Sequence, residues 1–558
     1  MKPQFNIGQS DFKNLIEKGG YYIDKSLFIK EIIEDNNEVL LLPRPRRFGK
    51  TLNLSMLKYF FEKTEEDNSK LFNGFAIEKE NDLFTKHQGQ YPILSLTFKD
   101  VVYTNFNSAS FAIKKIIAEE FSKHDYIIDK LDKPEEEKYF KNIIYKEKNL
   151  DYFGDALKFL SKHISAYHNK KVIVLIDEYD TPIHYAYKYG FYDEMITFMR
   201  TFLSGGLKDN KDLHKAVVTG ILRVAKESIF SGLNNLGVYT IISHRFSDKF
   251  GITEPELEKV CEDFGCADDL EGIRKWYNGY KFAKTTIYNP WSITKYISNK
   301  EDGFRPYWIN TSSNEIIHEL ISESPLSVKK NLEKLLNKEP FKRSLREEIV
   351  LRDVKTNFDN VYSFLYFSGY LTYSTKERIG DEDYYNLIVP NKEVLFSFKD
   401  IISNWFNNSF GNDDLQLMLK ALTEGDTKLF EKIFSSFVIS TLSYFDVNKK
   451  NEEAVYQAFI LGMLTNLSNT HEINSNKESG YGRSDISIIP KDKSKPGIIM
   501  ELKTIDSFEN ESKDTALKNA TTQIIERKYK TELIKRGIKE IIQMGVVFDG
   551  KRVWVQTI

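Results

Sequence analysis

Four short, uninterrupted apolar runs constrain the fold of the first 222 residues. They cover residues 38–42, 92–98, 172–176 and 216–219, and helical patterns separate them. A run that is apolar at nearly every position, without alternation, is typical of a strand buried on both faces. Parallel sheets covered by helices on both sides contain such strands. The sequence therefore predicts an α/β domain over residues 1–222.

The first run leads into a candidate phosphate-binding loop. Gly49, Lys50 and Thr51 follow it and open a helical segment, LNLSMLKYFFEK. In this arrangement backbone N–H groups and the lysine face the phosphates of a nucleotide, and the threonine hydroxyl binds magnesium. The tripeptide alone is a weak signal, because about 0.4 matches are expected by chance in such a chain. Its place between a strand and a helix is what predicts a nucleotide site.

This loop departs from the pattern G-x-x-x-x-G-K-[ST] at its first glycine, where Arg44 stands. A side chain at this position narrows the space for an anion. Arg44, Arg46 and Arg47 also add positive charge, which we expect to act at the phosphates or on another anion.

Two other runs end in polar side chains. Asp177 and Glu178 follow the run at 172–176, and Thr219 ends the run at 216–219. In a nucleotide hydrolase Asp177 would hold magnesium and Glu178 would polarise the attacking water. Thr219 is placed to sense the γ-phosphate on a strand between the other two. The alternative is that the acidic residues cap a helix near Thr181.

Residues 451–558 contain a second constellation of polar residues. Asp485 begins a predicted strand, and Glu501 and Lys503 share one face of the next, since side chains alternate along a strand. If the strands form a hairpin, Asp485 and Glu501 meet across it. Two carboxylates, a backbone carbonyl and waters suit Mg²⁺. Lys503 would then orient the attacking water and stabilise charge on a phosphodiester.

Two flanking helices offer further site residues. Glu453 lies on a predicted amphipathic helix before the strands, and Gln523 on a long helix predicted over about 513–536. The order Glu, Asp, Glu-x-Lys, Gln resembles the core of PD-(D/E)XK nucleases, and this resemblance implies a metal-dependent nuclease site. An exposed ladder of ion pairs on a hairpin is the alternative.

Several longer segments also resemble a known family. They are YYIDKS, RPRRFGKTLNLSMLKYFF, VLIDEYDTPI, VVTGILRVAKESIFSGLNNL and WYNGYKF…YNPWS. Over nearly the whole chain the sequence resembles bacterial AAA-ATPase-like proteins with a C-terminal PD-(D/E)XK nuclease-like domain. In that family an arginine-rich loop without its first glycine is usual. Gln457 is a departure, because relatives often have histidine there.

The resemblance implies an α/β fold made of a P-loop NTPase core of the additional-strand class, a helical lid, a helical or winged-helix-like middle region and an α/β restriction-endonuclease-like domain. The predicted boundaries are 1–222 for the ATPase-like domain, 223–330 for the lid, 331–450 for the middle region and 451–558 for the nuclease-like domain. Residues 363–372 resemble the last helix and wing entry of a winged helix. The aromatic residues of the lid are interpreted as core packing rather than as platforms for bases; they are Trp276, Tyr277, Tyr280, Phe282 and Trp291.

The predicted site residues fall into three sets. The catalytic set is Glu178, Asp485, Glu501, Lys503 and Gln523. The set that binds ATP is Arg46, Arg47, Gly49, Lys50, Thr51, Asp177 and Thr219. The set that binds Mg²⁺ or Mn²⁺ is Thr51, Asp177, Glu453, Asp485 and Glu501. Arg223 is a weaker candidate as a sensor, with a salt bridge as the alternative.

Composition limits the partners. The 79 basic and 81 acidic side chains give a formal net charge of -2, so no global field draws the molecule onto nucleic acid or a membrane. No stretch approaches the roughly 18 to 20 apolar residues that cross a bilayer. The 2 cysteines, Cys261 and Cys266, have no paired ligands at metal-site spacing, and we expect a cytoplasmic protein. Nucleic acid, DNA ahead of RNA, is the expected partner, and a homo-oligomer stays open.

Three functions fit these features. The favoured one is an ATP-binding and ATP-hydrolysing protein that controls a metal-dependent nuclease site in the C-terminal domain. The second is a nucleotide-dependent switch whose nuclease-like domain binds nucleic acid or a partner without cleaving it. The third is a winged-helix regulator, which would bind duplex DNA without residues 451–558.

Overall fold

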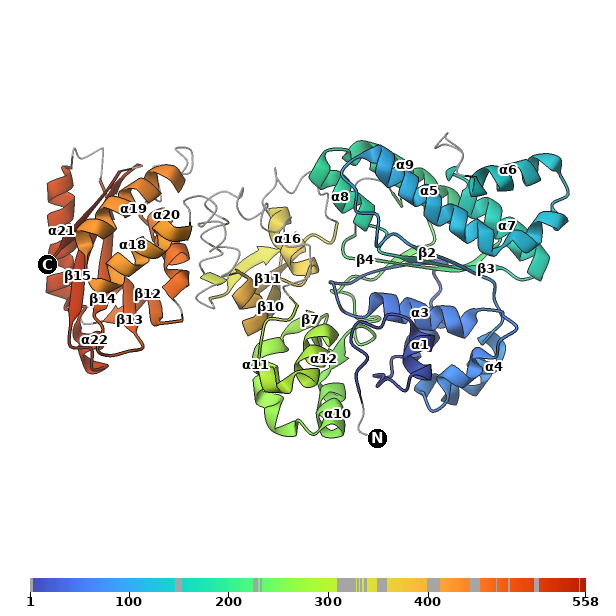
Figure 1. Cartoon of the computed structure of the whole chain (residues 1–558), viewed down its shortest axis with the longest axis horizontal. Coiled ribbons are helices and arrows are strands. Elements are labelled where there is room, and N and C mark those ends of the chain that lie inside the picture. The colour runs from blue at the N-terminus through green and yellow to red at the C-terminus, as the bar shows by residue number, and fades with distance from the viewer. Residues whose placement is uncertain are drawn as a thin grey trace. The chain divides into compact units, whose positions relative to one another are not determined.

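The fold was analysed in a computed structural model of the 558-residue chain (Figure 1). It describes residues 4–145, 153–223, 229–230, 233–308, 339–348, 359–398, 412–441, 452–467, 469–479, 482–505, 511–550 and 552–558, with a few single positions between 328 and 335. The chain forms two compact units, residues 1–312 with 342–394, and residues 313–341 with 395–558.

The first unit is built on a five-stranded parallel sheet. Its order is β2-β3-β4-β1-β5, with β1 at Val39–Pro43, β2 at Ile93–Thr97, β3 at Val172–Asp177, β4 at Leu213–Gly220 and β5 at Leu236–Val238. The first four match the predicted apolar runs. β4 lies between β1 and β3, so the ends of these three strands are neighbours. The α/β prediction is confirmed.

Helices cover both faces of this sheet, as the fully apolar strands require. Figure 1 shows α1 (Phe12–Glu17) and α3 (Lys50–Phe61) on one side. On the other side lie α5 (Phe106–Lys123), α7 (Ala156–His168) and α9 (Tyr192–Leu207). The helix α8 (Thr181–Tyr189) follows β3 directly.

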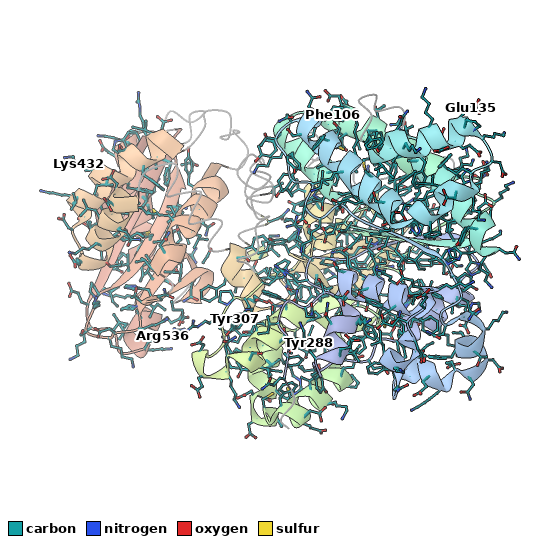
Figure 2. All side chains as sticks on the ribbon, turned by 45° about the vertical axis from the view of Figure 1, so that its right-hand side comes forward. Phe106, Glu135, Tyr288, Tyr307, Lys432 and Arg536 are labelled. Carbon is teal, nitrogen blue, oxygen red and sulfur yellow. The ribbon has the colours of Figure 1, made fainter. Side chains whose placement is uncertain are left out.

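A small helical subdomain follows in the chain. It holds α10 (Glu254–Phe264), α11 (Leu270–Tyr277) and α12 (Pro290–Ser298) around a sheet of order β6-β8-β7, formed by Ile252–Thr253, Thr285–Tyr288 and Tyr280–Phe282. Tyr277, Tyr288 and Tyr296 are buried in its core, and Figure 2 labels Tyr288 there. Of the aromatic residues predicted to pack in the core, Tyr277, Tyr280 and Phe282 are buried.

The middle region contains a helix and a hairpin. The helix α16 (Asp359–Phe367) precedes β10 (Thr372–Ile379) and β11 (Glu382–Ile388), and β9 (Phe341–Ser344) pairs beside β11. The Tyr373 hydroxyl donates to the Ala283 carbonyl at 2.6 Å, and Lys281 Nζ to the Ser374 carbonyl at 3.1 Å. The hairpin is therefore docked on the small subdomain.

The second unit contains a mixed five-stranded sheet. Its order is β12-β13-β14-β15-β16, from His471–Ser479, Gly482–Pro490, Gly497–Thr504, Ile541–Asp549 and Arg552–Thr557. Only β14 and β15 are parallel; the other neighbours are antiparallel. The sequence predicted the strands β13 and β14; it missed β12, in which polar side chains interrupt the apolar pattern, and β16, whose apolar run is only three residues long. This α/β sheet is consistent with a restriction-endonuclease-like domain.

Helices cover both faces of this second sheet as well (Figure 1). One face packs on α18 (Asn412–Glu424), α19 (Thr427–Thr441) and α20 (Glu452–Leu464). The other packs on α21 (Lys513–Arg527) and α22 (Thr531–Lys535). The compact unit therefore also includes α18 and α19, which precede residue 451.

The long helix predicted over 513–536 is wrong in one respect, because it breaks after Arg527. Lys528 adopts a left-handed conformation with φ 54°, and the chain turns before α22 begins. Tyr529 is thereby directed into the core, where its side chain is 2% exposed. Helical periodicity continues across the break, so the sequence pattern did not reveal it. No helix among the described residues is both long and apolar enough to span a membrane.

Candidate functional sites

The loop between β1 and α3 forms the first site. Gly49 caps α3 with φ 86°, a conformation that glycine adopts without the steric penalty of a side chain. The helix then begins at Lys50, so its first N–H groups point into the loop. Arg47 also has a positive φ of 67°, which is uncommon for a residue with a side chain. Strain of this kind marks candidate functional loops.

The ends of three strands converge on one carboxylate. Thr51 Oγ1 donates to Asp177 Oδ2 at 2.6 Å, and Thr219 Oγ1 donates to Asp177 Oδ1 at 2.6 Å. Asp177 is 4% exposed, and burial, with the nearby charge of Glu178, raises its pKa. The residues predicted from three separate segments are therefore in direct contact.

Lys50 and Glu178 lie beside this centre. The Lys50 ammonium donates to the carbonyl oxygens of Arg44 and Pro45 at 3.2 Å each, and it lies 3.6 Å from Glu178 Oε1. Glu178 has a positive φ of 53° at the end of β3, and its Oε2 accepts from Thr181 Oγ1 at 3.0 Å. This backbone conformation points Glu178 away from the strand direction and toward the loop.

The guanidinium of Arg44 is bound to backbone carbonyl groups, so the prediction that it acts on an anion is wrong. Its guanidinium is fully buried and donates to the carbonyl oxygens of Pro43 at 2.8 Å, Tyr239 at 2.6 Å and Phe246 at 3.2 Å. It also lies 4.7 Å from the Phe250 ring centroid. Burial lowers its pKa to about 9. Arg44 thus connects the loop to the segment after β5 through hydrogen bonds.

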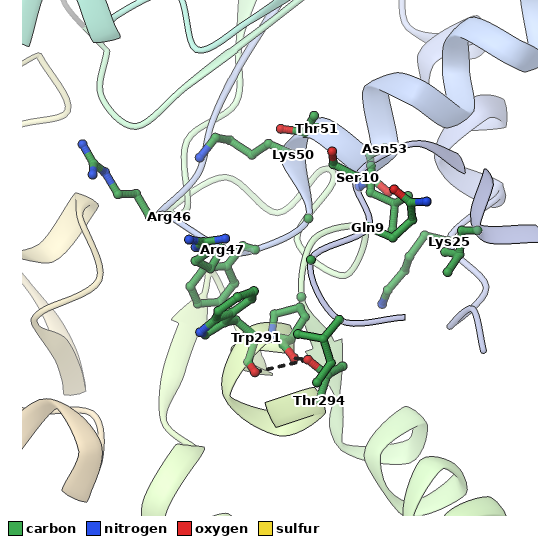
Figure 3. Close-up of a pocket in the computed structure, with 18 of the residues that line it drawn as sticks. Gln9, Ser10, Lys25, Arg46, Arg47, Lys50, Thr51, Asn53, Trp291 and Thr294 are labelled. Carbon is green, nitrogen blue, oxygen red and sulfur yellow. Dashed lines mark hydrogen bonds between the residues drawn. The ribbon is translucent and has the colours of Figure 1, made fainter. Parts of the chain in front are cut away.

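A cavity of about 590 Å³ opens beside the loop. The loop supplies Arg46 to Asn53, the N-terminal segment supplies residues 5–10, and α12 supplies Trp291 and Thr294 (Figure 3). The Arg47 guanidinium lies over the Trp291 ring, 4.1 Å from its centroid. Trp291 is therefore a site residue that the sequence interpretation had assigned to core packing. Its helical spacing gave no sign of this role.

Two charged residues near this site, Asp180 and the candidate sensor Arg223, have structural contacts. Asp180 Oδ2 accepts from the backbone N–H groups of Ile221 and Leu222 at 2.8 and 2.9 Å. A Cβ on Gly220 would lie 2.5 Å from Asp180 Oδ1, so only glycine fits there. Arg223 Nη2 forms a salt bridge with Glu348 Oε1 at 2.9 Å, the alternative considered for it. Its role as a sensor stays a prediction.

The donor set at the first site fits a magnesium nucleotide. A hydroxyl oxygen and a carboxylate in contact, Thr51 and Asp177, are hard oxygen ligands of the kind Mg²⁺ prefers. A cation there would also favour the ionised form of Asp177, which burial disfavours. Lys50 and the start of α3 supply the positive side of a phosphate site.

The second site lies where β13 and β14 part. Ile486 pairs with Met500, so Asp485 and Glu501 stand opposite each other one position beyond. Asp485 Oδ2 accepts from the Leu502 N–H at 2.8 Å. Ile486 and Met500 pack under α20, so by alternation Asp485 and Glu501 face α21. The predicted hairpin pairing is confirmed.

Lys503, Gln523 and Tyr529 surround the Glu501 carboxylate. Lys503 Nζ lies 3.7 Å from Glu501 Oε1, and Gln523 Nε2 donates to the same oxygen. Gln523 Nε2 also lies 3.3 Å from the Tyr529 hydroxyl. Tyr529 was not predicted as a site residue, because only the break at Lys528 brings it here. Its ring packs with Ile489, and burial raises the pKa of its hydroxyl.

Gln457 acts on the backbone of this site. Its Nε2 donates to Ser475 Oγ and to the Asp485 carbonyl, both at 3.0 Å. It therefore fixes β12 and β13 next to Asp485. Glu453 belongs to α20, and its side chain lies outside the described part of the structure.

The second site also offers donors that suit a divalent ion. Asp485 and Glu501 supply carboxylate oxygens beside the backbone of Leu502, and Glu501 is 1% exposed. Burial raises the pKa of Asp485, which a bound cation would counteract. Within the described residues no group of three or more His, Cys, Asp and Glu side chains gathers in a metal-binding arrangement.

Comparison with known proteins agrees with this geometry. Residues 6–230 match the family model described as predicted AAA-ATPase, and residues 451–558 match that of the PD-(D/E)XK nuclease superfamily. An uncharacterized protein in the vnfD 5' region of Azotobacter chroococcum mcd 1 is 27% identical over 398 residues, which is 71% of this chain and 69% of that protein. This chain therefore carries an AAA-ATPase-like domain and a C-terminal domain of the PD-(D/E)XK nuclease superfamily.

Proposed function

We propose that the chain binds and hydrolyses ATP and that this activity controls a metal-dependent nuclease site in the C-terminal domain. The contact of Thr51 and Thr219 with Asp177 supports the first half. The meeting of Asp485, Glu501, Lys503 and Gln523 supports the second and is the observation on which the nuclease depends. We place the protein in the cytoplasm, with DNA tested ahead of RNA as its substrate.

In the ATPase half, the residues of the chain have distinct tasks. Lys50 and the N–H groups that open α3 bind the β- and γ-phosphates, and Glu178 orients the attacking water. Magnesium held by Thr51 and Asp177 would neutralise charge on the phosphates. Trp291 and the N-terminal segment enclose the rest of the nucleotide in the cavity of about 590 Å³.

In the nuclease half, Asp485 and Glu501 would hold Mg²⁺ or Mn²⁺, with Glu453 as a further ligand; the ion would activate water and polarise the phosphodiester. Lys503 orients the water and stabilises negative charge on the phosphate as it develops. Gln523 keeps the Glu501 carboxylate in place through its amide.

The direct test uses the purified full chain with ATP, Mg²⁺ or Mn²⁺, and a mixture of duplex DNA, single-stranded DNA and RNA. We expect the wild type to cleave and Asp485→Ala and Lys503→Ala to lose cleavage. Asp492→Ala is the matched control, because Asp492 lies in the turn of the same hairpin and contacts Ser494. Cleavage by Asp485→Ala at the wild-type rate would reject the nuclease site.

The ATPase half has its own control. Lys50→Ala should abolish ATP binding, whereas Lys58→Ala, on the same helix and ion-paired with Glu62, should retain it. Equal binding by both variants would reject the nucleotide site.

A switch without cleavage is the second candidate. It is favoured by the two-carboxylate set described at the second site, where no third acidic or histidine ligand is in place among the described residues. This candidate predicts ATP binding, nucleic-acid binding and no cleavage with any metal.

A further inference from the structure

Glu393 is a buried carboxylate that neither proposed site uses. Its side chain is fully buried in the first unit, just after β11. An ionised carboxylate in such a place needs several hydrogen-bond donors to be tolerated. The donors that it has come from the small helical subdomain and from the segment after it.

Two of these donors lie on different elements. Ser292 Oγ, in α12, lies 3.0 and 2.8 Å from the two carboxylate oxygens of Glu393. The backbone N–H of Trp308 donates to Glu393 Oε1 at 2.7 Å. Glu393 therefore fixes both α12 and the chain at Trp308.

Both elements hold the same carbonyl of the nucleotide loop. Trp308 Nε1 donates to the Arg46 carbonyl at 3.2 Å, and Asn289 Nδ2 lies 3.5 Å from the same oxygen. Asn289 is the N-cap of α12, and its Oδ1 accepts from the N–H groups of Trp291 and Ser292. Two routes thus run from Glu393 to the Arg46 carbonyl.

The peptide at Arg46 determines where the next residue lies. Arg47 has a φ of 67°, and its guanidinium lies over Trp291 at the wall of the cavity. A backbone in this sparsely populated region persists only when its surroundings hold it. The hydrogen bonds to the Arg46 carbonyl stabilise this backbone conformation of Arg47.

We propose that Glu393 is a positioning residue for the nucleotide-binding loop, acting through Trp308 and through α12 on the Arg46 carbonyl. This inference rests on the proposed binding of ATP at Lys50 and Thr51. It makes the segment that follows β11 part of the nucleotide site, although no residue of it lines the cavity.

The titratable groups that face Glu393 among the described residues are the hydroxyls of Tyr277 from α11, Tyr280 from β7 and Tyr307 from the segment before Trp308. Burial raises the pKa of each, so they stay neutral near pH 7. Burial also raises the pKa of Glu393 to about 7. Its bond to the Trp308 N–H is charge-assisted above that pH and weaker below it.

The test measures binding of the magnesium complex of AMP-PNP to the full chain by calorimetry from pH 6 to 8.5. We expect Trp308→Phe, which keeps a ring and removes the indole N–H, to bind about fivefold more weakly than wild type, the loss of one hydrogen bond. The wild-type affinity divided by that of Glu393→Gln should rise about two- to fivefold through pH 7. This ratio cancels the titration of the ligand.

Two further variants separate positioning from stability. In the double variant Glu393→Gln/Trp308→Phe the loss of affinity should be smaller than the product of the two single losses, because the two residues share the route through Trp308. Glu120→Gln is the matched control. Glu120 is also a buried carboxylate of this unit, bonded to the Ser95 N–H at 2.8 Å, and it does not line the cavity. Its variant should keep the wild-type affinity and pH profile.

The outcomes are distinct. A wild type that binds AMP-PNP no better than Lys50→Ala would overturn the proposed nucleotide site and the role of Glu393 with it. A wild type that binds, with Glu393→Gln showing the same affinity and pH profile, would overturn the role of Glu393 alone.

Discussion

At the scale of single residues, Glu393 has a consequence for stability as well as for the loop. Its pKa is raised by burial to about 7, from an ordinary value of 4.5. Between these values the native carboxyl keeps its proton and the unfolded one releases it. Unfolding therefore releases a proton in this window, and the free energy of unfolding falls as pH rises.

We predict that the contribution of Glu393 to the free energy of unfolding falls by about 1.4 kcal/mol per pH unit between pH 4.5 and 7 and levels off above pH 7. The measurement is the difference in thermal unfolding between wild type and Glu393→Gln from pH 5 to 8. As pH rises, the unfolding midpoint of the wild type should fall relative to that of Glu393→Gln. A difference that does not change with pH would show that Glu393 titrates normally in the folded protein.

Tyr529 leads to a second prediction at this scale. Tyr529→Phe keeps the buried ring and removes the hydroxyl beside Gln523 Nε2. A lost hydrogen bond of about 1 kcal/mol corresponds to roughly fivefold slower cleavage. The single-turnover rate is the measurement. The double variant Gln523→Ala/Tyr529→Phe should be no slower than Gln523→Ala alone, because the hydroxyl acts through the amide.

The matched control for this prediction is Tyr456→Phe. Tyr456 is also fully buried in the second unit, and its hydroxyl donates to the Gly550 carbonyl at 2.7 Å. Its variant should lose stability and keep the cleavage rate. Equal rates for Tyr529→Phe and wild type would remove Tyr529 from the site.

At the scale of elements, the break between α21 and α22 is set by Lys528. A residue with a side chain in the left-handed region costs about 1 kcal/mol relative to glycine. Lys528→Gly should therefore raise the midpoint of thermal unfolding of the second unit by roughly 2 to 4 °C. Lys518→Gly, inside α21, should lower it. If Lys528→Gly instead lowers the midpoint, the contacts of the Lys528 side chain stabilise the fold by more than the left-handed conformation destabilises it.

The elements also show what sequence reasoning can and cannot reach. The four buried strands of the first sheet were predicted because a short, continuous apolar run between helical patterns favours a strand covered on both faces. The edge strands β12 and β16 were missed, because β12 is mostly polar and the apolar run of β16 is only three residues long. The break at Lys528 depends on a backbone conformation that no helical periodicity records.

The same limit applies to the sites. Residues in motifs were found from their places at the ends of predicted elements, with Thr51 at the start of a helix, Asp177 at the end of a strand and Asp485 at the start of a strand. Arg44 was assigned to the phosphates because charge alone suggests an anion, whereas its partners are carbonyl groups about 200 residues away in the chain. Trp291 and Glu393 join the nucleotide site only through tertiary packing.

At the scale of the whole molecule, the proposal joins two separate sites in one chain. Each has carboxylates, hydroxyl or amide groups and a lysine in contact, and each belongs to a compact unit of its own. Control of one by the other requires that ATP change the activation free energy of the nuclease reaction. Coupling of this kind is typically 1 to 3 kcal/mol, which corresponds to about 5- to 150-fold.

The most direct test of this claim is the rate of nucleic-acid cleavage by the full chain with and without ATP, at fixed Mg²⁺ or Mn²⁺. We predict that ATP changes the wild-type rate by at least about fivefold, that Lys50→Ala cleaves at one rate in both conditions, and that Asp485→Ala cleaves in neither. A wild type that binds ATP and cleaves equally fast with and without it would contradict the account.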